Sequence, residues 1–192
     1  QELAYCEKAQ LHHRHKREIG KYAASLVEDG QVVYLDAGTT TFEIARSLAE
    51  RFNLTVVTND FSIIQHLMNR PQLSLFHTGG QVDQRNYSCV GNSAAMLLRS
   101  LNIDVAFIST SSWDLEHGLS TPHEEKVLVK QALLEVARRR VLVSDSSKYG
   151  KYGMFRVCPL EALSDIICDA ALPPEAQQLL RERGLQLHNV QL

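Results

Sequence analysis

The regular alternation of short apolar runs with amphipathic segments constrains the fold more than any other feature of this sequence. Apolar runs occupy residues 32–35 (VVYL), 54–57 (LTVV), 105–108 (VAFI) and 141–143 (VLV), and segments with helical spacing lie between them. This alternation is typical of βα units that build a parallel sheet, and uniformly apolar strands are typical of sheets covered on both faces. We therefore predict a Rossmann-like α/β fold, with a mostly parallel sheet of about six to seven strands and helices on both faces.

Composition narrows the classes of function. The formal net charge is −2, from 20 Lys and Arg against 22 Asp and Glu, which argues against a chain that holds nucleic acid by itself. No apolar run approaches the roughly 20 residues that span a bilayer, so we expect no membrane partner. The four cysteines lie far apart without a CxxC pair, which favours reduced thiols in a cytoplasmic protein.

The first 17 residues differ from the rest because they are polar and rich in histidine. Residues 12–17 (HHRHKR) form the basic cluster of the sequence, and His12 and His15 have the spacing of one helix face. No Asp or second spaced Cys completes a metal-binding set, so we expect a solvated connector, no metal ion and no cofactor. The chain begins at Gln1 rather than Met, and we expect further sequence upstream.

Polar residues follow each of five expected strands. They are Asp36 with the GTTT of 38–41, TND at 58–60, TGGQ at 78–81, STSSWD at 109–114 and SDSSKYGK at 144–151. The carboxyl ends of parallel strands lie at one edge of a sheet, and ligands of open α/β sheets bind there. We therefore expect these segments to converge on one ligand site.

Three of these positions have both a functional and a structural interpretation. The turn at 38–41 offers backbone N–H groups to an anion, or Thr39 or Thr40 is only an N-cap. Lys148 neutralises a phosphate or is a solvated loop residue, and Asn59 binds a polyol or caps a helix. The GxGxxG, GxxxxGK[ST] and GxSxG motifs are absent, so the sequence indicates neither a dinucleotide site, a P-loop nor a nucleophile elbow.

The segments LDAGTTTFEIARSL, LTVVTND, TGGQVDQRNYSCVG, DVAFISTSSWDLEHGLST, VKQALLEVARRRVLVSDSSKYG and DIICD resemble the C-terminal effector-sensing domain of the DeoR family of bacterial sugar-operon regulators. The resemblance covers about residues 14 to 190. It implies a fold similar to ribose-5-phosphate isomerase and the CoA-transferase-like enzymes. It also implies a phosphorylated sugar or related effector, and operator DNA bound through a missing N-terminal winged helix-turn-helix domain. Residues 1–17 would then be its connector and 18–192 the effector-binding and oligomerisation domain.

Carried over motif by motif, the resemblance implies a set of ligand-binding residues and no catalytic residue. The set is Asp36, Gly38, Thr39, Thr40, Thr41, Asn59, Gly79, Gly80, Glu125, Lys130, Asp145, Ser147 and Lys148. One position departs from the family pattern, because Lys126 stands where many members carry Glu. An additional cation suits a more acidic effector, such as a phosphorylated sugar acid, or it is only a surface change.

Three functions follow from these features. The first is a non-enzymatic sensor domain of a transcriptional repressor, which binds a phosphorylated sugar or sugar acid and forms a homo-oligomer, a dimer or tetramer. The second is a sugar-phosphate isomerase-like enzyme, for which Asp36, Glu124 and Glu125 are the candidate bases. The third is an oligomerisation module without a ligand. The expected loop at 111–121 contains Trp113 and His117, which line either a pocket or a subunit contact.

Overall fold

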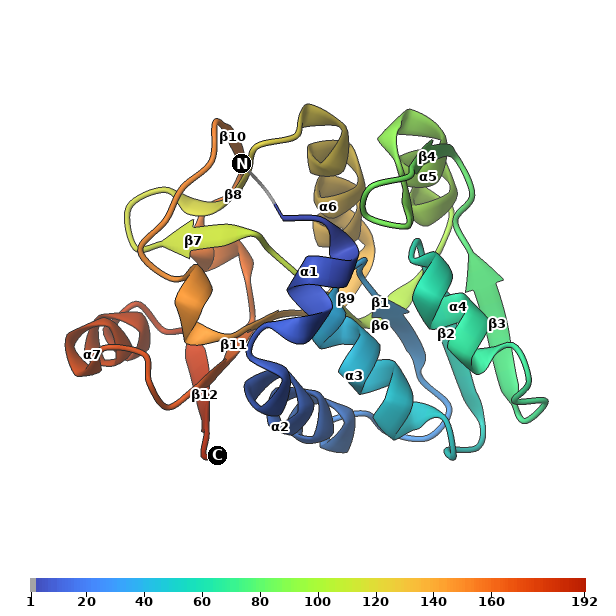
Figure 1. Ribbon diagram of the computed structural model, residues 1–192, viewed down its shortest axis with the longest axis horizontal. Coiled ribbons are helices and arrows are strands. Elements are labelled where there is room, and N and C mark those ends of the chain that lie inside the picture. The colour runs from blue at the N-terminus through green and yellow to red at the C-terminus, as the bar shows by residue number, and fades with distance from the viewer. Residues whose placement is uncertain (1–2) are drawn as a thin grey trace.

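A seven-stranded parallel sheet organises the computed structural model, which describes residues 3–192 (Figure 1). The strand order is β12-β11-β9-β6-β1-β2-β3, and every neighbouring pair is parallel. This confirms the predicted α/β fold and its seven strands. The bounds are β1 Val32–Leu35, β2 Leu54–Thr58, β3 Leu73–His77, β6 Ile103–Ile108, β9 Ala137–Ser144, β11 Asp165–Asp169 and β12 Gln186–Val190.

Helices cover both faces of this sheet and bury two separate cores. Along β1, Tyr34 packs into one core, whereas its neighbours Val33 and Leu35 pack into the other. The side chains of α2, α3 and α4 join the core of Val33, and those of α5, α6 and α7 join the core of Tyr34. The helices are α1 Tyr5–Gln10, α2 His13–Ser25, α3 Thr39–Leu48, α4 Phe61–Leu67, α5 Gly91–Arg99, α6 Glu124–Val136 and α7 Pro174–Glu182.

The packing of α2 against α3 depends on one glycine. A Cβ added to Gly20 would lie 2.6 Å from the Cβ of Glu43 and 2.7 Å from its carbonyl carbon, closer than real Cβ contacts come. Gly20 therefore permits α2 to lie directly against α3. This fixes the position of the N-terminal helices relative to the ends of the central strands.

Two antiparallel elements are added to the parallel sheet. Strands β7 (Ser112–Asp114), β8 (Gly118–Thr121) and β10 (Phe155–Cys158) form one small sheet, and β4 (Gln81–Asp83) pairs with β5 (Ser88–Val90). The expectation of a loop over 111–121 was therefore wrong. These strands have only three or four residues, too few for the apolar alternation by which a strand is recognised in a sequence.

Trp113 lies on β7, within the segment that was expected to be a loop, and it is fully buried. Its indole N–H donates a hydrogen bond to Ser144 Oγ at 3.1 Å, and its ring contacts Tyr149 edge to face. Trp113 is thus neither exposed for a subunit contact nor among the residues that line the cavity described below. Instead it joins the small sheet to the end of β9.

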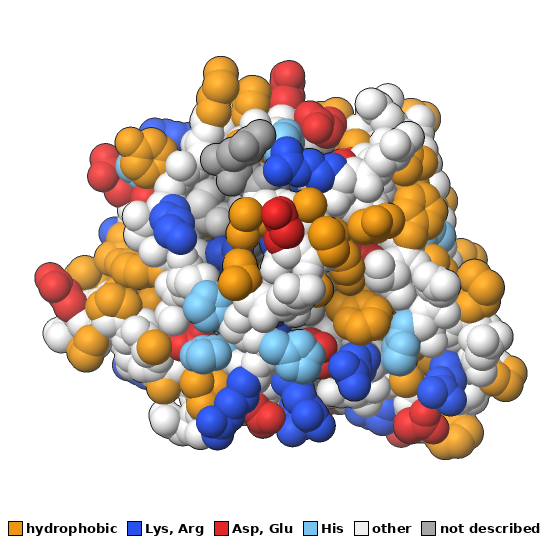
Figure 2. All heavy atoms as spheres, viewed as in Figure 1, with side chains coloured by type: hydrophobic (Ala, Val, Ile, Leu, Met, Phe, Trp, Pro, Cys, Tyr) orange, Lys and Arg blue, Asp and Glu red, His pale blue; other side chains and the backbone are white. Residues whose placement is uncertain are grey.

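The N-terminal segment forms two helices, with α1 in front of the ends of the central strands and α2 below it (Figure 1). Histidine side chains and those of Lys or Arg gather over the lower part of this face, where α2 lies (Figure 2). Within the described part of the chain, no group of three or more His, Cys, Asp or Glu is arranged to hold a metal ion. Nor does any helix over residues 3–192 have the length and apolar character to cross a membrane.

Candidate functional site

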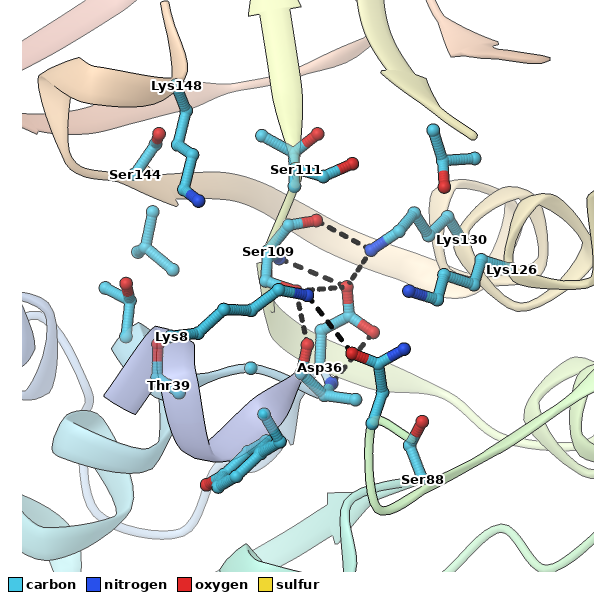
Figure 3. A pocket seen from close by; sticks show the side chains of 18 of the residues that line it. Lys8, Asp36, Thr39, Ser88, Ser109, Ser111, Lys126, Lys130, Ser144 and Lys148 are labelled. Atoms are coloured by element: carbon cyan, nitrogen blue, oxygen red, sulfur yellow. Dashed lines mark hydrogen bonds and ion pairs between the residues drawn. The ribbon is translucent and has the colours of Figure 1, made fainter. Parts of the chain in front are cut away.

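A cavity opens at the carboxyl ends of β1, β6 and β9, where the sequence predicted a ligand site. It encloses about 850 Å³ of space, a volume that includes its open mouth. Residues from the ends of β1, β2, β6 and β9, from β5 and β8, from α6 and from the N-terminal helices line it (Figure 3). The polar lining residues are Tyr5, Lys8, Lys16, Asp36, Thr39, Thr40, Asn59, Asn86, Ser88, Ser109, Thr110, Ser111, Thr121, Lys126, Lys130, Ser144, Asp145 and Lys148.

At the base of the cavity, Asp36 and Lys130 form a buried ion pair of 2.5 Å. The Asp36 carboxylate also accepts hydrogen bonds from the Ala37 amide and from the amide and hydroxyl of Ser109. Lys130 Nζ donates a second bond, of 2.6 Å, to the carbonyl of Ser109. Both charges are therefore compensated within the protein, and the pair joins α6 to the ends of β1 and β6.

The turn after β1 places the start of α3 at the cavity. Gly38 is the N-cap with an extended backbone, and its amide donates to Asp60 Oδ2 at 3.1 Å. Neither Thr39 nor Thr40 caps the helix through its side chain, so that alternative was wrong. A Cβ at Gly38 would approach Ser109 Cβ to 3.0 Å, which explains glycine here. The first-turn amides and the positive end of the helix dipole are thus presented to the cavity.

The sequence left open whether Asn59 binds a ligand or caps a helix, and in the structure its neighbour Asp60 is the cap. Asp60 caps α4, since its Oδ1 accepts from the Ile63 amide at 3.0 Å, and burial raises the pKa of its carboxyl to about 6. Asn59 accepts from the Tyr34 hydroxyl at 2.7 Å and the Ala37 amide at 3.0 Å, and it donates to the carbonyl of Cys89 at 2.8 Å. The helix-cap alternative for Asn59 was wrong. Its polyol-binding role stays a prediction.

The end of β9 brings a second carboxylate to the cavity. Asp145 is 2% exposed, and its Oδ1 accepts bonds from the amide and hydroxyl of Ser147. Its Oδ2 is also buried, yet it has no hydrogen-bond partner among residues 3–192. A buried carboxylate oxygen without a donor is costly. Asp145 is thus a carboxylate of the cavity wall with one oxygen that no described residue satisfies.

Three lysines of the cavity were absent from the predicted site. Lys16 is 3% exposed and donates to the carbonyl of Lys8 at 2.5 Å, while Lys8 Nζ donates to Asn86 Oδ1 at 3.1 Å. Burial lowers the pKa of Lys16 to about 8, an effect that Asp145 opposes and that Lys148 and Lys8 strengthen. Lys126 comes from the first turn of α6. Periodicity could have identified Lys16, which shares a helix face with Ile19 and Ala23. Only the departure from the family pattern pointed to Lys126, and no signal pointed to Lys8.

Of the predicted residues, Asp36, Gly38, Thr39, Thr40, Asn59, Lys130, Asp145 and Lys148 converge on the cavity. Five do not line it, namely Thr41, Gly79, Gly80, Glu125 and Ser147. The hydroxyl of Thr41 donates to the carbonyl of Gly38, and Glu125 lies half exposed beside His123. Gly80 has a positive φ, and a Cβ there would meet the Ala94 amide at 3.0 Å. These residues have evident local structural roles, and their binding of ligand stays a prediction.

Comparisons with known proteins agree on the family. Residues 11–170 match the family model described as DeoR C terminal sensor domain. An HTH-type transcriptional regulator of Haemophilus influenzae is 45% identical over 97% of this chain and 72% of its own length. The regulator YgbI of Escherichia coli is 50% identical over 90% of this chain and 67% of its own length. The regulator GlpR of Haloferax volcanii is 32% identical over 96% of this chain and 72% of its own length.

Solved structures agree on the fold alone, because sequence identity to them is low. Ribose 5-phosphate isomerase A of Methanocaldococcus jannaschii has a TM-score of 0.51 and 19% identity, over 70% of this chain and 53% of that one. RipA of Yersinia pestis has a TM-score of 0.55 and 12% identity, over 80% of this chain and 44% of that one. The chain therefore spans about half of these structures. The predicted likeness to sugar-phosphate isomerases in fold is confirmed.

Proposed function

Since the chain belongs to the DeoR family of transcriptional regulators and carries its sensor domain, we propose that it binds a phosphorylated sugar or sugar acid. In this proposal, the ligand occupies the cavity at the strand ends and modulates operator binding by an N-terminal domain of a cytoplasmic repressor. The observation that carries it is electrostatic. Five lysines and the N-terminus of α3 surround a cavity that holds two aspartates.

The chemistry of the lining suits a polyhydroxylated anion. The first-turn amides of α3, with Lys16 and Lys148 nearby, supply donors for a phosphate group. The hydroxyls of Ser88 and Ser111 can donate to or accept from sugar hydroxyls. Asp145 Oδ2 has no hydrogen-bond donor among the described residues and would accept a hydrogen bond from a hydroxyl group of the ligand. Inorganic phosphate alone supplies such hydroxyl groups less well than a sugar. The lining therefore favours a sugar derivative over a simple anion.

The N-terminal helices provide a route from the cavity to the rest of the regulator. Helix α1 has no buried residue, and its links to the domain include the Tyr5 amide to Arg85 carbonyl bond of 3.3 Å and the Lys8 to Asn86 bond. The carbonyl of Lys8, in the last turn of α1, accepts a hydrogen bond from the ammonium of Lys16. A ligand held by Lys8 and Lys16 would therefore fix α1 against the domain. Linkage then requires that operator binding change ligand affinity by the same factor.

An isomerase-like activity is the second candidate, because Asp145 lines the cavity and its buried Oδ2 has no donor among the described residues. The other candidate bases are placed less well. Asp36 is paired with Lys130, and neither Glu124 nor Glu125 lines the cavity. Incubation of the domain with aldose phosphates, followed by NMR over hours, separates the two functions. Conversion of an aldose into a ketose would contradict a pure sensor.

A thermal-shift panel of sugar phosphates, sugar-acid phosphates and their unphosphorylated forms tests the proposal. A ligand at 100 times its dissociation constant adds about 2.7 kcal/mol of stability, or roughly 5–10 °C for a domain of this size. Lys148→Gln should remove most of the shift, since a charge-assisted hydrogen bond contributes about 1.5–3 kcal/mol. Lys151→Gln is the matched control, because Lys151 is exposed in the same loop and does not line the cavity. No shift with any phosphorylated compound would contradict the proposal.

We further propose that the domain forms a homo-oligomer, as repressors of two-fold operators do. Strand β3 is a sheet edge, and Phe76 on it is 52% exposed. Met68, at the end of α4 next to it, is 66% exposed. Exposed edges and apolar side chains of this kind are commonly covered by a partner. Light scattering should give a multiple of the 21.6 kDa chain mass, and a monomer at micromolar concentration would contradict this proposal.

A further inference from the structure

Helix α1 forms part of the cavity wall, although none of its residues is buried. Tyr5 and Lys8 of this helix line the cavity, and the Lys8 side chain extends from α1 into it (Figure 3). A segment that buries no side chain can separate from a domain at a small cost in free energy. Helix α1 is therefore a part of the wall that can move.

The turn between β4 and β5 contacts α1 through three successive residues, Arg85, Asn86 and Tyr87. The Tyr5 amide donates a hydrogen bond to the Arg85 carbonyl at 3.3 Å. Lys8 Nζ donates to Asn86 Oδ1 at 3.1 Å. The rings of Tyr5 and Tyr87 meet edge to face, with their centroids 5.7 Å apart. This hairpin turn therefore holds α1 against the domain.

The carboxylate of Asp83 fixes the shape of the hairpin turn. Its Oδ1 accepts hydrogen bonds from the amides of Arg85 and Asn86 at 3.1 and 3.3 Å. Its Oδ2 accepts from Asn86 Nδ2 at 2.8 Å. This last bond orients the Asn86 side chain, so that its oxygen meets Lys8. The turn is thus held by bonds of its own and offers α1 a preformed surface.

Two residues separate α1 from α2 and form a hinge between these helices. Leu11 has an extended backbone, whereas that of His12 is left-handed, with φ 54° and ψ 35°. The left-handed region is strained for a residue with a Cβ, and such positions concentrate at switch regions. A rotation about these two residues would move α1 as a unit and leave α2 packed on α3 through Gly20.

Helix α1 covers Lys16, one of the lysines to which we assign the phosphate of the ligand. Lys16 is only 3% exposed, and its ammonium donates to the carbonyl of Lys8 in the last turn of α1. Lys16 lines both the cavity and a second, adjacent hollow, and Tyr5 and Ala9 of α1 line that hollow as well. A phosphate that binds Lys16 must therefore reach a group that α1 shields from solvent. The observed position of α1 restricts entry to the site.

We propose that α1 is a strap over the effector cavity, which the hairpin turn holds closed and which opens about Leu11 and His12 to admit the ligand. The proposal rests on the proposed function and adds the regulation of the same site. Asp83 and Tyr87 are positioning residues, because they hold the strap and do not line the cavity. In the proposed repressor α1 leads to the DNA-binding domain, so the position of the strap reports to that domain whether the cavity is occupied.

Acylation of Lys16 by acetic anhydride measures the opening of the strap without any ligand. Peptide mass spectrometry gives the rate at Lys16 relative to that at Lys21, an exposed lysine of the same helix. Tyr87→Ala should raise this relative rate about three- to tenfold, as the loss of an aromatic pair implies, because only the open form reacts. Tyr87→Phe retains the ring and is the matched control, which should leave the rate unchanged. Asp83→Ala should raise the rate as Tyr87→Ala does.

Binding kinetics test whether the strap controls entry. With glucose 6-phosphate and ribose 5-phosphate as probes, Tyr87→Ala should raise the association and dissociation rate constants together, although Tyr87 does not line the cavity. Tyr87 is 51% exposed, and an unchanged melting temperature of the variant verifies folding. Equal acylation of Lys16 in the native domain and in Tyr87→Ala would overturn the strap and leave the proposed function intact. Absence of binding by every phosphorylated compound would contradict the proposed function, while the acylation rates still decide whether α1 opens.

Discussion

Affinity for a phosphorylated ligand should fall as the pH rises through about 8, because the ammonium of Lys16 must be protonated to bind an anion. Burial lowers the pKa of Lys16 from 10.5 to about 8 in the free protein. A phosphate placed against the ammonium stabilises the protonated form and raises that pKa again. Binding above pH 8 is therefore coupled to the uptake of about one proton.

The size of the effect follows from the free-protein pKa. Lys16 is roughly 90% protonated at pH 7 and roughly 10% protonated at pH 9. The ligand should therefore bind about tenfold more weakly at pH 9 than at pH 7, a difference of about 1.4 kcal/mol. The ligand's own titration does not obscure this, because the second pKa of a phosphate ester is about 6.

The same pKa fixes the sign of a stability effect. The folded pKa lies below the unfolded value, so protonated Lys16 disfavours folding below about pH 8, and the penalty is relieved as the pH rises from 8 to 10.5. The difference between the unfolded and folded pKa values of Lys16 corresponds to a loss of about 3 kcal/mol of folding stability at neutral pH. Lys16→Met should therefore raise the melting temperature at pH 7 and at the same time weaken ligand binding.

Calorimetry in buffers of different ionisation enthalpy measures the proton uptake directly. At pH 8.5 the apparent binding enthalpy should change with the buffer for the native domain, and it should not change for Lys16→Met. Lys21→Gln, which removes an exposed lysine of the same helix, should behave as the native domain does. A buffer-independent enthalpy in the native domain, or a pH dependence that survives in Lys16→Met, would refute the reasoning.

Three further predictions concern the framework of the site. Gly20→Ala should lower the free energy of unfolding in urea by about 1–3 kcal/mol, because its Cβ would lie 2.6 Å from Glu43 Cβ; an unchanged transition would contradict the close packing of α2 on α3. Trp113→Phe should cost at least about 1 kcal/mol in the same assay, since it leaves Ser144 without the indole donor. Ligand should slow amide hydrogen exchange in α1 but not in α7, which does not line the cavity, and equal effects on both would argue against coupling through α1.

The sequence predicted the parallel sheet because its strands are uniformly apolar, a local property that burial on both faces imposes. It predicted the convergence of Asp36, Asn59 and Asp145 because topology alone brings the ends of parallel strands together. It did not predict the strands of the small sheet that holds Trp113. Runs of three or four residues carry no periodicity, and these strands exist through pairing, β7 with β8 and β8 with β10.

The cations of the cavity mark a second limit of sequence reasoning. Lys8, Lys126 and Lys148 are separated by more than a hundred positions from first to last, and only the fold brings them to one cavity. A formal net charge of −2 for the chain therefore coexists with a cavity that carries three formal positive charges. Net charge governs the binding of extended anions, such as nucleic acids, which contact a broad surface. A small anion interacts chiefly with the groups that enclose it, because water and salt screen the charges beyond about 8–10 Å. The composition that argues against nucleic-acid binding is thus compatible with a site for a small, multiply charged metabolite.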